Sequence, residues 1–139
     1  MIEYPARFTR EKEGGFSVVF PDLPGCITEG DSMEEAMANA REALTGYLES
    51  IDSRSLKIPR PSALKGRGIR LIAPEKTVAF AIGLKALREE RGLNQKQVAE
   101  RIGIAYQTYQ RFEDPVKANP TLKSIERLEK VFGLDLIKL

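Results

Sequence analysis

The sequence predicts an α+β fold followed by a small all-α domain, and three observations predict it. Apolar and polar residues alternate over residues 4–8 and 16–20, which is the two-residue period of a half-buried strand. Apolar residues then recur at helical spacing from Met33 to Ile51. The apolar spacing after residue 76 is helical throughout. We therefore expect a three- or four-stranded sheet with one long helix over residues 1–73, and a helical domain over residues 74–139.

The N-terminal elements follow from turn and cap residues. Gly14 and Gly15 predict the turn of a β-hairpin, and the Pro/Gly-rich residues 21–25 predict a further turn before a short third strand over residues 26–30. Residues 69–72 are a candidate fourth strand. Ser32 and Glu35 form a capping box that starts the long helix. The stripe expected to pack on the sheet is Met33, Met37, Ala40, Leu44, Tyr47, Leu48 and Ile51.

The C-terminal domain is expected to contain four helices. The first spans residues 76–91 and is ended by Gly92, and the second begins after Asn94 with Gln97 completing its cap. Gly103 separates it from a third helix over residues 106–113. The last helix begins at Thr121 and is expected to bury Leu122, Ile125, Leu128 and Val131 or Phe132. The tail, residues 134–139, alternates apolar residues like a strand.

Charge is distributed unevenly along the 139 residues. Residues 1–52 hold 4 basic and 11 acidic residues, residues 53–73 hold 6 basic residues and no acid, and residues 74–139 hold 12 basic and 9 acidic residues. An acidic N-terminal part and a basic C-terminal part of the chain suggest two different partners. The linker-like basic stretch, residues 53–68, is suited either to DNA phosphates or to docking on the acidic domain, and the sequence leaves both open.

Composition argues against several functions. The chain contains no histidine, which removes Ser-His-Asp and Cys-His catalysis and the commonest zinc ligand. One cysteine forms no internal disulfide, and no apolar run approaches the roughly 20 residues that span a bilayer, so a cytoplasmic location is expected. A magnesium nuclease built on Asp22 and Glu29 is disfavoured, because two-metal sites need several convergent carboxylates. We expect no catalytic residue, metal or cofactor.

Residues 93–113 carry the pattern of a helix-turn-helix. Ala99 is small enough for two helices to cross closely, Gly103 permits the turn, and Val98, Ile104, Tyr109 and Phe112 are expected to bury the contact. Gln and Arg pair bidentately with adenine and guanine, each for roughly 1–3 kcal/mol of discrimination. Gln95, at the start of the second helix, and the loop that follows residue 113 are expected to contact DNA phosphates. The DNA-binding candidates are Gln95, Tyr106, Gln107, Thr108, Gln110, Arg111, Lys117 and Asn119.

Residues 76–133 resemble the Cro/C1 repressor type of helix-turn-helix, including the later Pro120-Thr121-Leu122 and Ile125-Leu128 pattern. Ala105 departs from it, because Ser or Thr usually caps the recognition helix there. One such domain contacts only a half-site, so we expect a homodimer on a palindromic operator, with further pairing into a tetramer left open. The expected dimer seam is helix 122–132 with the apolar tail residues Leu134, Leu136 and Ile137.

Residues 1–52 resemble the HicB antitoxin family. The resemblance rests on Tyr4-Pro5-Ala6, Gly14-Gly15-Phe16-Ser17-Val18, the run from Phe20 to Cys26, Thr28-Glu29-Gly30 and the helix that starts at Ser32. It implies a partial RNase H-like fold that masks HicA, a small basic toxin that cleaves mRNA, and autorepression of the operon through the separate DNA-binding domain.

An acidic surface suits such a partner. The expected toxin contacts are Asp22, Glu29, Asp31 and Glu34, clustered at one end of the sheet, with Pro21 and Leu23 as the apolar centre. The alternative is a stand-alone repressor whose N-terminal domain senses a small ligand or oligomerises.

Overall fold

The computed structural model describes residues 2–136, which form two compact units, residues 2–75 and residues 76–136. The first unit ends at Glu75, where the sequence suggested Ala73. Glu75 is tied to the long helix of the first unit: its N–H donates to Thr45 Oγ1 (2.9 Å), and its carboxylate pairs with Arg41 (3.3 Å). Over residues 2–136, no helix combines the length and the apolar character needed to cross a membrane.

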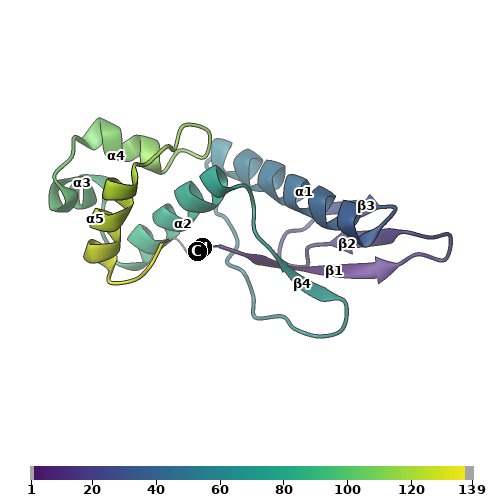
Figure 1. Ribbon diagram of the computed structural model, residues 1–139. Coiled ribbons are helices and arrows are strands. Elements are labelled where there is room, and N and C mark those ends of the chain that lie inside the picture. Colours follow the sequence, from purple (N-terminus) through teal and green to yellow (C-terminus); the bar gives the residue numbers. More distant parts are fainter. Residues whose placement is uncertain (1, 137–139) are drawn as a thin grey trace. The chain divides into compact units, whose positions relative to one another are not determined.

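The first unit is a four-stranded antiparallel sheet with one long helix, α1, against one face (Figure 1). The strands lie in the order β3-β2-β1-β4. Their bounds are β1 Tyr4–Arg10, β2 Phe16–Val19, β3 Ile27–Gly30 and β4 Ile69–Ile72. The α+β fold class expected from the sequence is therefore confirmed, with the fourth strand present.

The strand register separates an inner face from an outer face. Phe8 pairs with Val18, and Val18 with Thr28, on the face that α1 covers, where Phe8 and Val18 are buried. One position along, Val19 pairs with Ile27 on the opposite face. These two apolar side chains stay 43% and 65% exposed, so the outer face presents apolar surface to water.

Helix α1 (Met33–Ser53) begins at the predicted cap. Ser32 Oγ accepts a hydrogen bond from the Glu35 N–H (3.1 Å). The Glu35 carboxylate accepts from the N–H of Asp31 (2.7 Å), one residue before the expected partner. The buried stripe is Ala36, Ala40, Leu44, Leu48 and Ile51; the predicted members Met33, Met37 and Tyr47 are only half-buried.

The sheet approaches α1 closely at Gly30. A Cβ atom at Gly30 would lie 2.4 Å from the backbone nitrogen of Ala36. That distance is too short for any side chain and involves backbone atoms that cannot rotate away. Glycine at this position therefore lets β3 lead into α1 while the first turn of the helix packs against the strand.

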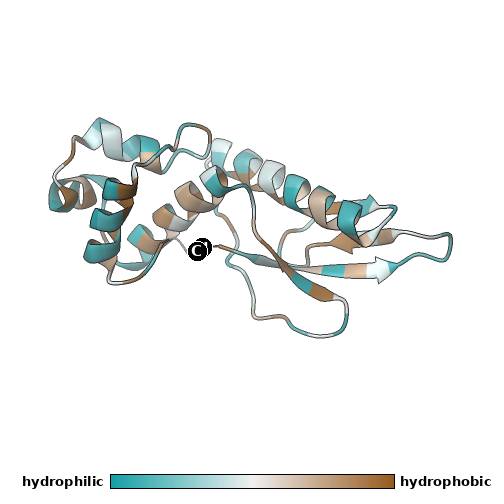
Figure 2. Cartoon of the chain, viewed as in Figure 1, coloured by the Kyte–Doolittle hydropathy of each residue, from teal (hydrophilic) through white to brown (hydrophobic). Residues whose placement is uncertain are grey.

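The second unit consists of four helices, α2 Lys76–Glu90, α3 Gln95–Ile102, α4 Tyr106–Phe112 and α5 Leu122–Phe132. Asn94 caps α3 in a complete capping box with Gln97, and Thr121 caps α5. Gly103 ends α3 in the left-handed region (φ 73°), as the tight turn requires. Figure 2 shows α2 coloured mainly brown along its middle, where Phe80, Ala81 and Leu84 join the core.

The start of α5 and the tail differ from expectation. Leu122 is 79% exposed, because the buried face of α5 is formed by Ile125, Leu128 and Phe132. Residues 134–136 form no strand; instead the N–H of Leu136 donates to the Glu129 carboxylate (2.7 Å). The remaining tail, including the predicted seam residue Ile137, lies outside the described residues.

Gly30→Ala is expected to destabilise the first unit by about 1–3 kcal/mol, because the added methyl group overpacks the contact with Ala36. Gly46→Ala is the matched control: it lies within α1, and a Cβ there meets nothing within 4 Å. It should stabilise by about 0.5–1 kcal/mol. Urea unfolding followed by circular dichroism measures both. Equal effects of the two substitutions would contradict the close approach.

Candidate functional site

Helix α4 presents a polar face to solvent. Gln107, Gln110 and Arg111 have the i, i+3, i+4 spacing of a single helix face, and all three are exposed. Thr108 is exposed beside them. Tyr109 and Phe112, on the opposite side, are buried in the core of the second unit. The polar face is therefore available to a partner, as the sequence suggested.

Tyr106, at the start of α4, is half-buried, and the Nζ atom of Lys96 lies 5.3 Å above its ring. That stacking joins α3 to α4 and adds a cation at the edge of the polar face. Lys117 and Asn119, in the loop between α4 and α5, are both exposed. The loop is held by Asp114, whose Oδ1 accepts from the N–H of Val116 (2.9 Å).

The orientation of α4 depends on the buried carboxylate of Glu113, which follows the helix directly and is 6% exposed. Arg88 of α2 binds it with two hydrogen bonds, from Nε (2.7 Å) and Nη2 (2.9 Å). The Tyr109 hydroxyl donates to it at 2.5 Å, and the Gln95 amide donates from α3 at 3.1 Å. The carboxylate thus ties three helices together.

Protonation within this network is well defined. Burial raises the pKa of the Tyr109 hydroxyl far above its usual range, and the hydrogen bond to Glu113 raises it further. The hydrogen bond to Glu113 also raises the pKa of the Arg88 guanidinium. Arg88 is therefore charged and Tyr109 neutral over the whole physiological range.

Gln95 departs from the sequence expectation. We predicted that its side chain contacts a DNA phosphate, but its amide is engaged inside the protein with Glu113. It is half-buried rather than projecting into solvent. This engagement depends on a residue 18 positions away, so local sequence gives no signal of it.

The four predicted acidic contacts do not share one end of the sheet. Asp22 follows β2 beyond the Val19–Ile27 pair, whereas Asp31 follows β3 beyond the Phe16–Gly30 pair at the opposite end. The Asp22 carboxylate is also engaged, accepting from the N–H of Ser62 (2.9 Å). The clustering of Asp22 with the others was therefore wrong.

Glu11 and Glu13 join Asp31 and Glu34 instead. The β1–β2 turn that carries them packs against the β3–α1 connection, since a Cβ at Gly15 would lie 2.7 Å from the Gly30 carbonyl oxygen. All four side chains are exposed. We call Glu11, Glu13, Asp31 and Glu34 the acidic end. Glu11 and Glu13 lie beside the other two because of the strand register, which the sequence alone does not reveal.

The predicted apolar centre also changes. Leu23 is fully buried and cannot contact a partner, while Pro21 is exposed. The exposed apolar side chains nearest in the sheet are Val19 and Ile27 on the outer face. Glu29 lies on that same face, because it follows Ile27 by two residues along β3.

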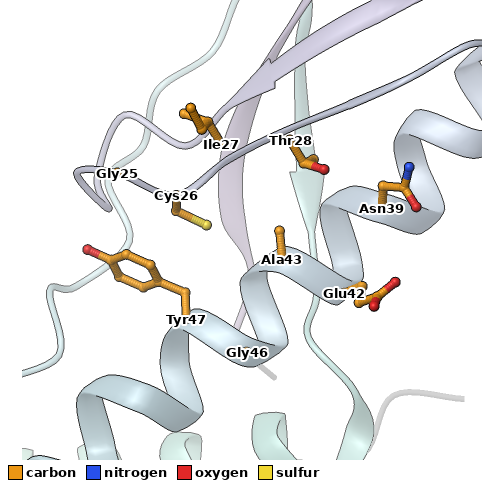
Figure 3. Close-up of a pocket in the computed structure, with 9 residues that line it drawn as sticks. All are labelled: Gly25, Cys26, Ile27, Thr28, Asn39, Glu42, Ala43, Gly46 and Tyr47. Atoms are coloured by element: carbon orange, nitrogen blue, oxygen red, sulfur yellow. The ribbon is translucent and has the colours of Figure 1, made fainter.

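An open hollow of about 470 Å³ lies between β3 and α1 (Figure 3). Figure 3 shows Cys26 and Thr28 on the strand side and Asn39, Ala43 and Tyr47 on the helix side. Burial raises the pKa of the Cys26 thiol to about 11. Over residues 2–136, no group of three or more His, Cys, Asp or Glu side chains is placed to hold a metal ion.

Known proteins similar to the chain cover both units. Residues 4–85 match the family described as HicB-like antitoxin of bacterial toxin-antitoxin system, and residues 84–139 match a helix-turn-helix family. The chain is 31% identical to Antitoxin HicB 1 of Photorhabdus laumondii, over 97% of this chain and 84% of that protein. It is 30% identical to Antitoxin HicB of Escherichia coli K12, over 73% of each.

A shorter match involves the cryptic phage CTXphi transcriptional repressor RstR of Vibrio cholerae, with 37% identity over 43% of this chain and 53% of that protein. The family match covers more than half of the chain, and the alignments with the two HicB relatives cover most of each relative's length. The chain therefore belongs to the HicB-like antitoxin family of bacterial toxin–antitoxin systems, and it carries a C-terminal helix-turn-helix.

Proposed function

We propose that this protein is the antitoxin of a toxin–antitoxin pair, which neutralises a small, basic, mRNA-cleaving toxin of the HicA type and represses its own operon. The observation that carries the proposal is the joining of an antitoxin family match over residues 4–85 to a helix-turn-helix over residues 84–139. The first unit binds the toxin, and the second binds operator DNA. Catalysis forms no part of this function.

Operator binding is assigned to α4. Gln107, Gln110 and Arg111 are exposed on one face and have the side chains that form bidentate pairs with adenine and guanine. Thr108 and Tyr106 flank them, and Lys117 and Asn119 supply phosphate contacts from the loop. The Gln95 amide is hydrogen-bonded to Glu113. We therefore assign the phosphate contact of α3 to the backbone N–H groups of its first turn.

Toxin binding is assigned to the outer face of the sheet and the acidic end. Val19 and Ile27 form the apolar centre, with Pro21 at its rim. Glu29 and the acidic end surround it with negative charge, which steers a basic partner toward the face and competes with the RNA that the toxin would otherwise bind.

Dimerisation is assigned to the second unit, because one helix-turn-helix contacts only a half-site and half-sites lie roughly 34 Å apart. Val116 and Leu122 are 77% and 79% exposed, so an interface could bury both side chains. Leu134 is 39% exposed and Leu136 half-buried. These residues, together with Ile137, form the proposed seam.

The function as a whole is tested by co-expression with the product of any short reading frame found beside the gene. The neighbouring product alone should arrest growth and cleave mRNA, and co-expression of this chain should restore growth. Copurification of the two proteins in fixed stoichiometry is expected. Unimpaired growth with the neighbouring product alone, or no copurification, favours the stand-alone repressor and turns attention to the hollow beside Cys26.

Gln107→Ala and Arg111→Ala are each expected to relax base preference by about 1–3 kcal/mol at one operator position. Lys117→Ala, the matched control in the loop, should weaken binding to all duplexes alike and flatten the salt dependence. Fluorescence anisotropy on the operator duplex and on single-base-pair variants of it separates the two behaviours. Unchanged operator affinity and base preference in both α4 variants would show that the recognition helix is wrongly assigned.

Neutralising three carboxylates around the proposed toxin surface is expected to slow association with the toxin about tenfold or more at low salt, and less at high salt. The variant is Glu29→Gln, Asp31→Asn and Glu34→Gln. The control removes the same charge elsewhere on the first unit: Glu3→Gln, Glu42→Gln and Glu49→Gln. Stopped-flow mixing with the toxin measures the rates. If both triple variants slow association equally, net charge rather than this surface steers the toxin.

Arg88→Met is expected to destabilise the second unit by about 3–5 kcal/mol, because it leaves the Glu113 carboxylate buried without its cation. Operator affinity should fall with it. Lys130→Met, which breaks the exposed pair with Glu126, should cost less than about 1 kcal/mol. Urea unfolding gives both values. Arg88→Met with Glu113→Gln should recover part of the loss; no recovery would contradict the unpaired charge as its cause.

A further inference from the structure

A dense run of positive charge follows α1 in the sequence. We call residues 54–70 the basic arm. It carries six basic residues and no acid, and all six side chains are exposed. They are Arg54, Lys57, Arg60, Lys65, Arg67 and Arg70.

The backbone of the basic arm is fastened to the sheet. The buried hydroxyl of Tyr4 donates to the Pro59 carbonyl oxygen (2.6 Å), and the Ser62 N–H donates to the Asp22 carboxylate (2.9 Å). Further along, the Gly68 carbonyl accepts from the Phe8 N–H (2.7 Å). The backbone of the arm is therefore held in place on the sheet. Because it is already ordered, binding of a ligand costs little backbone conformational entropy.

Among the residues that the structure describes, the charged groups of the arm have no counter-ions. Over residues 2–136, none of the six takes part in an ion pair, although Arg41 of the same unit pairs with Glu75. The Arg54 side chain donates to the Ser50 carbonyl oxygen, at 3.4 Å, and not to a carboxylate. Six like charges fixed on one short segment repel one another, and a polyanion that approaches them removes this repulsion.

We propose that the basic arm binds the phosphate backbone of DNA that flanks the bases contacted by α4, an inference that rests on the proposed operator binding. Arg70 precedes the first residue of α2 by six residues, a span of at most about 20 Å of extended chain. Once α4 holds the operator, the arm therefore meets DNA at high effective concentration. A basic toxin is repelled by the same charges.

Binding of this kind adds affinity without adding base preference. Lys and Arg contacts to phosphate release condensed counter-ions, so each contact steepens the dependence of log K on log salt by about 0.9. Base discrimination comes from contacts to base edges and is left to α4. The arm and the recognition helix are thus distinguishable by which of the two quantities a substitution changes.

The test uses the full chain and a labelled duplex of about 40 base pairs, roughly four helical turns, from the region upstream of its own coding sequence. Anisotropy titrations over a series of salt concentrations give the slope. The arm variant is Lys57→Gln, Arg60→Gln and Lys65→Gln. We expect a slope shallower by about 1 to 3 for each protomer bound, with base preference unchanged. The matched control removes three exposed cations of the β1–β2 hairpin, Arg7→Gln, Arg10→Gln and Lys12→Gln, and should keep the wild-type slope.

The outcomes separate the arm from the proposed function. Operator binding by the wild-type chain, with a slope that the arm variant leaves unchanged, overturns the arm proposal and leaves the operator function standing. Failure of the folded wild-type chain to bind any duplex overturns both. Tighter binding of a single-stranded RNA of equal length, lost only in the arm variant, assigns the arm to RNA and overturns its assignment to DNA.

Discussion

The arrangement of the second unit depends on one carboxylate that is almost fully buried. Glu113 follows the C-terminus of α4, where the helix dipole disfavours a negative charge, and burial disfavours it further. Arg88 offsets both costs with a two-point contact, and Tyr109 and Gln95 supply the remaining donors. Because these donors come from α2, α3 and α4, a single ionic group sets how the recognition helix is presented.

The first unit holds its acidic and basic side chains in different places, although its net charge is small. Residues 1–73 hold 10 basic and 11 acidic residues, so their net charge is close to zero. In the fold, acidic side chains gather where the β1–β2 turn meets the β3–α1 connection, while the cations of the basic arm stand on a segment of their own. Partners of opposite charge can therefore be assigned to one unit of about 75 residues.

Features set by local chemistry were predicted well from the sequence. The caps at Ser32, Asn94 and Thr121, and the strand alternation from Tyr4, depend only on neighbouring residues. The contacts of Leu23, Leu122, Gln95 and Asp22 that the sequence did not predict have a different origin. Each depends on what a distant segment places beside the residue: the core for Leu23, the rotation of α5 for Leu122, Glu113 for Gln95, and strand register for Asp22.

The burial of Cys26 has a practical consequence for spectroscopy. The side chain is 3% exposed and its thiol pKa is raised to about 11, so at pH 7 about one molecule in ten thousand carries the thiolate. Maleimide dyes and spin labels react with thiolates that they can reach. A cysteine introduced at an exposed position would therefore take the label alone, and the wild-type chain already provides a nearly silent background for distance measurements.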